Sequence, residues 1–166
     1  MTVLGITVVD ALPGLIGGLL SGIVAGHYAA RAEVSYQQRA TAVTELRRLT
    51  LEVDRTFRTW IMWTGYESEW EDYQLQGFYE VAAKNDALAS YYGVHSVWLS
   101  GKTRESVERI IRGFTDHNAR LMEASSEDQH KRREAAGAAR QWHDRDLPEL
   151  IDNLQALPRW RRIFGG

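Results

Sequence analysis

The chain contains no cysteine, and this absence sets the first limits on its chemistry. Disulfide bonds, cysteine nucleophiles and cysteine-ligated metal centres are all excluded. The net charge is only −2 over 166 residues, which argues against general binding to nucleic acid. Residues 31–63 contain neither glycine nor proline, and the chain shows no alternating strand pattern and no repeat. The sequence therefore predicts an all-α protein.

A run of 20 residues without a charged side chain, 11–30, lies near the N-terminus, after ten residues that end in Asp10. A helix of that length is about 30 Å long, which matches the hydrocarbon core of a bilayer. We therefore predict a transmembrane helix over these residues. Asp10 would cap its first turn, where Pro13 is tolerated. A span shifted to 3–26 would instead bury Asp10 in the membrane and make it a functional candidate.

Four glycines lie at a strict spacing of four within this predicted span: Gly14, Gly18, Gly22 and Gly26. On a helix they form one stripe without side chains, which lets two helix backbones approach closely in lipid. A parallel row of small residues runs beside it: Gly17, Ser21, Ala25 and Ala29. The pattern predicts a packing face, and its partner is either a second copy of the chain or another membrane protein.

The charges that flank the predicted span set its expected orientation. Residues 1–10 carry no lysine or arginine, whereas Arg31, Arg39, Arg47 and Arg48 follow the span. The positive-inside rule then places the N-terminus outside and the remaining chain in the cytoplasm. Arginine outnumbers lysine 17 to 3, as is typical of a GC-rich genome. We therefore expect the inner (cytoplasmic) membrane of a bacterium, with a bacterial or phage gene.

The rest of the chain has the apolar periodicity of a cytoplasmic antiparallel helical bundle. We expect 1–30 to hold the anchor, 31–45 a helical stalk and 46–166 the bundle. The first helix should continue unbroken from about residue 10 to 63, and 94–99 should form an extended linker. The later helices are expected at 67–91, 100–123, 126–144 and 146–156, with caps at Ser100 or Thr103, at Ser125 or Ser126, and at Asp146.

Three tryptophans, Trp60, Trp63 and Trp70, flank the first predicted turn of the bundle. Packing in the core is one interpretation. The other is an exposed aromatic patch that binds a partner, because tryptophan is favoured in binding hot spots. The basic, aromatic C-terminus, 157–166, likewise either packs on the bundle or lies on the anionic inner leaflet.

No motif for a metal, a nucleotide or another cofactor is found. Residues 100–103 (SGKT) resemble the end of a phosphate-binding loop, but Ser96 stands where that motif needs its first glycine. We therefore expect a helix cap there. His143 with Asp144 and Asp146 is the densest polar cluster and the one place where an enzyme could be sought.

Two passages, 16–22 (IGGLLSG) leading into an arginine-rich helix and 85–88 (NDAL) before a capped helix, resemble small uncharacterised bacterial membrane proteins with one span. The resemblance implies topology and no site residues. The first hypothesis is an interaction or assembly protein that self-associates or docks through the glycine stripe. The alternatives are an oligomeric pore or membrane-perturbing effector, and a membrane-tethered enzyme.

Overall fold

A computed structural model describes the backbone of residues 8–64 and 71–154, and the side chains of residues 26–62, 64 and 75–154. Almost all of these residues are helical and none is in a strand, so the all-α prediction is confirmed. The elements are α1 (Val8–Thr64), α2 (Glu71–His95), the short 3₁₀ helix η1 (Ser96–Trp98), α3 (Gly101–Ser125) and α4 (Gln129–Asp152). The chain divides into two compact units, Met1–Gln38 and Arg39–Gly166.

The first unit consists of the N-terminal part of α1. The predicted helix from about residue 10 to 63 is confirmed for the backbone, since α1 runs from Val8 to Thr64. The side chains of residues 11–25, which make up most of the predicted span, lie outside the described residues, as do those of Asp10 and Pro13. Among the residues searched, none of the helices has the length and apolarity needed to cross a membrane.

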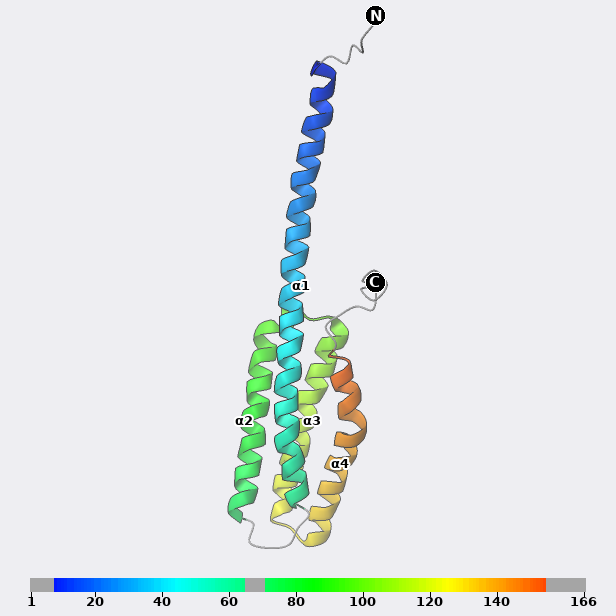
Figure 1. The fold of residues 1–166 in the computed structure, drawn as a ribbon. Helices are drawn as coiled ribbons and strands as arrows, with labels where there is room; N and C mark the ends of the chain where they lie inside the picture. Colours follow the sequence, from blue (N-terminus) through cyan, green and yellow to red (C-terminus); the bar gives the residue numbers. More distant parts are fainter. Residues whose placement is uncertain (1–7, 65–70, 155–166) are drawn as a thin grey trace, which may run out of the picture. The chain divides into compact units, whose positions relative to one another are not determined.

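The second unit is a bundle in which successive helices alternate in direction (Figure 1). Its core is a single cluster of buried apolar side chains from all four helices. On α1 the buried positions lie along one face at helical spacing, as a helix with one buried face requires: Ala42, Val43, Leu46, Thr50, Val53, Phe57, Trp60 and Ile61. Because Ala42 and Val43 are already buried, core packing begins within the segment expected to be a stalk.

Two buried asparagines join α2 to α3 inside this core. Asn85 donates to the carbonyl of Ile111 (3.1 Å) and to the hydroxyl of Thr115 (3.0 Å). Asn118 donates to the carbonyl of Phe78 (3.1 Å). A buried amide without a partner is costly, so these bonds fix the register of α2 against α3.

Several predicted helix ends are wrong. α2 continues through Gly93 to His95 and takes the first two residues of the expected linker. η1 takes the next three, and only Leu99 is extended. The cap of α4 is Asp128, whose carboxylate accepts from the backbone N–H of Lys131 (3.0 Å), rather than Ser125 or Ser126. By contrast, Ser100 caps α3 by accepting from the N–H of Thr103 (3.2 Å), as predicted.

The predicted break before Pro148 is also absent. α4 is one helix from Gln129 to Asp152 with Pro148 inside it. The proline ring cannot donate to the carbonyl four residues earlier, which costs stability. Leu147 and Leu150 on either side of it are buried, at 1% and 3% exposed. Burial of this apolar face offsets the missing hydrogen bond, so the last two predicted helices are one.

Candidate functional site

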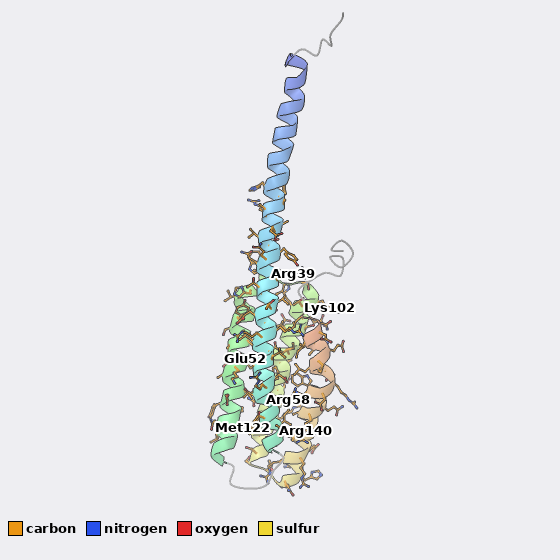
Figure 2. The ribbon with its side chains drawn as sticks, in the orientation of Figure 1. Arg39, Glu52, Arg58, Lys102, Met122 and Arg140 are labelled. Atoms are coloured by element: carbon orange, nitrogen blue, oxygen red, sulfur yellow. The ribbon has the colours of Figure 1, made fainter. Side chains whose placement is uncertain are left out.

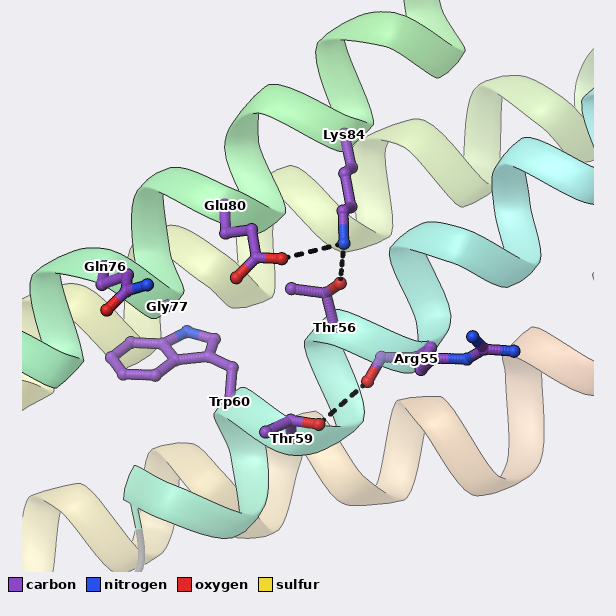
Figure 3. Close-up of a pocket in the computed structure, with 8 residues that line it drawn as sticks. All are labelled: Arg55, Thr56, Thr59, Trp60, Gln76, Gly77, Glu80 and Lys84. Atoms are coloured by element: carbon purple, nitrogen blue, oxygen red, sulfur yellow. Dashed lines mark hydrogen bonds and ion pairs between the residues drawn. The ribbon is translucent and has the colours of Figure 1, made fainter.

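A groove of about 470 Å³ lies between α1 and α2 (Figure 3). It falls within the size range of small-molecule pockets. Lys84 bridges its two walls, donating to the hydroxyl of Thr56 on α1 (2.6 Å) and pairing with Glu80 on α2 (2.9 Å). Arg55, Thr59, Trp60, Gln76 and Gly77 complete the lining. Lys84 and Glu80 pair with each other, and Figure 3 shows the Arg55 guanidinium directed away from Trp60 and Gly77, so the groove does not concentrate charge for a ligand.

Trp60 is packed into the core beside this groove rather than presented to a partner. Its side chain is 2% exposed, and its ring lies against Gly77 of α2. A Cβ at Gly77 would lie 2.8 Å from Cε3 of the Trp60 ring, so glycine is what admits the indole. Its buried Nε1 has no hydrogen-bond partner among the described residues. The partner-surface interpretation is therefore wrong for Trp60, while the side chains of Trp63 and Trp70 lie outside the described residues.

His143 contacts Asp144 and Asp54, whereas the sequence analysis groups it with Asp144 and Asp146. Its Nε2 lies 2.7 Å from Oδ1 of Asp54 on α1, and its Nδ1 lies 2.6 Å from Oδ1 of Asp144. The side chains of His143 and Asp54 are 12% and 14% exposed, whereas that of Asp144 is 71% exposed. Asp146 instead lies near His117, whose pKa is lowered by burial and secondarily by Arg120, with Asp146 acting in the opposite direction.

This arrangement joins α1 to α4 and leaves neither nitrogen of the imidazole free for acid–base chemistry. Both nitrogens can donate at once only from the doubly protonated ring. Arg58 adds a further, longer contact to Asp54 (3.4 Å). Across the part of the chain that the structure describes, no group of histidine and acidic side chains is arranged to hold a metal ion. The His143 cluster therefore has the geometry of a link between helices.

We predict that removing this link weakens the bundle without abolishing it. Asp54→Asn and His143→Gln should each lower the free energy of unfolding by about 1–2 kcal/mol, since hydrogen bonds to charged groups contribute about that much. The double variant should lose less than the sum of the two. Asp144→Asn is the matched control and should change stability by less than about 0.5 kcal/mol, because its carboxylate is exposed. Urea unfolding of the full-length chain measures all four, and additive losses would contradict the link.

A second groove, of about 300 Å³, lies between α3 and α4. The Trp142 ring lies in it against Gly113, and His117 packs on that ring with 5.1 Å between centroids. Three arginines line it together with two aspartates: Arg109, Arg112, Arg120, Asp116 and Asp146. The alternating charges make it a mixed polar surface and not a concentrated anion site.

The most exposed apolar turn of the described chain was not recognised from the sequence. Val94, Val97 and Trp98 are 71%, 75% and 39% exposed, at the end of α2 and in η1. The next residue, Leu99, is 6% exposed and belongs to the core. The signal in the sequence is three apolar residues within the five positions before Leu99, a segment that the sequence analysis interprets as a linker.

The glycine stripe lies on helical backbone at all four positions, Gly14, Gly18, Gly22 and Gly26. Side-chain surroundings are described for the last of them alone. At Gly26 the space that a Cβ would occupy is open, with no other atom within 4 Å. The adjoining residues 27–35 are exposed as well.

We find no match to the chain among family models, curated proteins or solved structures.

Proposed function

We propose that the chain is a single-span interaction or assembly protein of the bacterial inner membrane. Residues 11–30 are its anchor, the N-terminus is outside, and the helical bundle lies in the cytoplasm. It associates with a second copy or with another membrane protein through the glycine face of the anchor. The bundle is then presented to a partner.

The observation that carries this proposal is the helical backbone at the four glycine positions. A residue and its fourth successor share one side of an α-helix, so Gly14, Gly18, Gly22 and Gly26 lie close to one line along α1. The open space at Gly26 leaves that line available to another helix. Close approach of helix backbones at small residues is the main route to helix association in lipid.

The proposed orientation is supported by where the arginines lie. Arg31, Arg47 and Arg48 follow the proposed span and are exposed. Arg48 is engaged by Glu45 (2.6 Å) and by Glu52, but paired acids count for little in the positive-inside rule. The bundle itself has a complete buried core, as expected of a domain that lies in water.

In-membrane crosslinking tests the proposal directly, because the chain has no cysteine of its own. We expect a single cysteine at Gly18 to give crosslinked species in native membranes, and a single cysteine at Leu19 to give much less. The reason is that only the first position lies on the stripe along which backbones approach. A ladder at multiples of the chain mass indicates self-assembly, and a band of another mass indicates a docking partner.

Equal crosslinking at the two positions, or recovery of the chain in the soluble fraction, would contradict the proposal. The pore hypothesis makes an additional prediction for the glycine stripe. It requires overexpression to be toxic and Gly18→Leu or Gly22→Leu to remove the toxicity. An assembly protein would remain harmless in both forms and lose its crosslinks.

A further inference from the structure

We propose that the turn joining α2 to α3, formed by Val94, Val97 and Trp98, rests on the lipid surface of the membrane. This inference depends on the proposed anchor. Isolated exposed apolar residues are ordinary, but three within five positions form a patch. Leu99 holds the turn to the core while these three side chains face outward, at 71%, 75% and 39% exposed. An apolar patch on an otherwise complete bundle calls for a surface to cover it.

The patch lies at the end of the bundle where α1 enters. Burial, and secondarily the carboxylate of Glu45 on α1, raise the pKa of Tyr91, which places the last turns of α2 beside that part of α1. Figure 1 shows the connection from α2 to α3 at the end of the second unit where its part of α1 begins. The turn is therefore at the end of the bundle closest along the chain to the proposed anchor.

The short connection limits how far this end can be from lipid. Residues 31–38 separate the proposed span from Arg39, where the second unit begins. Eight helical residues measure about 12 Å. The headgroup layer on each side of a bilayer occupies roughly 5–8 Å of that length. Tethering at such a distance gives a high effective concentration, so a weak contact suffices.

The chemistry of the turn matches an interfacial position. Tryptophan is enriched at membrane–water interfaces, where its ring lies among headgroups and its N–H reaches polar partners. Arg39 and Lys102 lie at this end of the bundle (Figure 2), and Arg104 follows in the first turn of α3. Glu105 follows directly, and Glu45 and Glu108 lie beside Tyr91 and Tyr92 in the last turns of α2, so the charges at this end balance and do not by themselves favour anionic lipid. Apolar contact is therefore the main contribution to the binding of this turn to lipid.

A fluorophore placed at three single cysteines tests the inference in the full-length chain. Val97→Cys reports the turn, Ser126→Cys reports the exposed far end of α3, and Leu19→Cys reports the anchor. Each variant carries an environment-sensitive probe and is reconstituted into vesicles of phosphatidylcholine and phosphatidylglycerol. Quenching by a headgroup-labelled spin lipid at 97 and 126, and by an acyl-chain-labelled spin lipid at 19, which lies at the middle of the proposed span, is then compared with quenching by aqueous iodide.

We expect the probe at 97 to be quenched by the spin lipid several times more than the probe at 126, and to be protected from iodide. Weak lipid quenching at 97 with strong quenching at 19 would overturn the lipid contact and leave the anchor standing. Lipid quenching at none of the three would refute the anchor itself. Protection from iodide at 97 without lipid quenching would show that a protein covers the turn, and would also overturn the inference.

A second pair of variants separates contact from mere proximity. Trp98→Ser in the Val97→Cys background should reduce lipid quenching at 97 by at least half, because the interfacial side chain is removed. Tyr79→Ser is the matched control, since Tyr79 is an exposed aromatic residue on α2, at 63% exposed, well before the turn. It should leave the quenching unchanged. Equal effects of the two substitutions would overturn the inference.

Discussion

Replacing Gly113 with alanine is expected to destabilise the bundle by about 2 kcal/mol, although alanine is the better helix former. The reason is the Trp142 ring, which fills the place of the missing side chain. A Cβ at Gly113 would lie 2.5 Å from Cε2 and 3.0 Å from Cη2 of that ring. Since real side-chain atoms do not approach so closely, either the ring or the helix must move.

The Trp142 ring cannot move aside without losing its contacts with three neighbouring rings. Phe57 of α1 and Phe114 of α3 hold it edge-on, with centroids 6.0 Å and 5.2 Å away. His117 covers it from another side at 5.1 Å. Interiors packed at this density resist even one extra methyl group. The cost of overpacking, about 1–3 kcal/mol, therefore exceeds the stability gained from the higher helix propensity of alanine.

Gly137→Ala is the matched control for Gly113→Ala. Gly137 is also inside a helix, α4, but nothing lies within 4 Å of the place of its Cβ. This variant should gain about 0.5–1 kcal/mol. Urea unfolding followed by near-ultraviolet circular dichroism measures both. In addition, Gly113→Ala combined with Trp142→Leu should cost less than the sum of the single variants, and strict additivity would show that the ring is not the obstacle.

The helices and their buried faces were largely predictable, because apolar residues that recur with a 3.6-residue period can be recognised within a short stretch of sequence. Leu46, Val53, Phe57 and Trp60 of α1 are spaced by seven, four and three residues, which is helical periodicity, and all four are buried. Ser100 caps α3 as its position suggested. These features depend on neighbours within one or two turns, which is the range that a sequence displays.

Contacts between helices were not predictable in the same way. His143 was grouped with Asp146 because they are three residues apart, yet its partner on α1 is Asp54, 89 positions away. The glycines that lie against Trp60 and Trp142 have no sequence signal of their own, because glycine is required there only by a tryptophan ring packed from another helix. Local chemistry at Asp146 and Pro148 predicts a new helix capped at Asp146, but burial of Leu147 and Leu150 keeps α4 continuous through Pro148.

Phe57→Ala is expected to cost about 3–5 kcal/mol, the largest loss of any single substitution considered for this chain. Phe57 is fully buried and meets two other rings edge-on, Phe114 at 5.3 Å and Trp142 at 6.0 Å. The three rings come from α1, α3 and α4, so one truncation opens a cavity where three helices meet. Edge-on ring pairs add about 0.5–1.5 kcal/mol beyond their buried area, which puts the expected loss toward the upper end.

The control for Phe57→Ala is Leu51→Ala, on the same helix at 45% exposed, which should change stability by less than about 0.5 kcal/mol. Phe57→Leu should fall between the two, because it keeps apolar volume and loses the ring contacts. Since small domains are stable by only about 5–15 kcal/mol, the alanine variant should show a clearly lower urea midpoint. If the Phe57→Ala variant had the same urea midpoint as the Leu51→Ala variant, the three-ring contact would not hold α1 to the rest of the bundle. The second unit would then depend on the α2–α3 asparagine bonds and the α3–α4 packing alone.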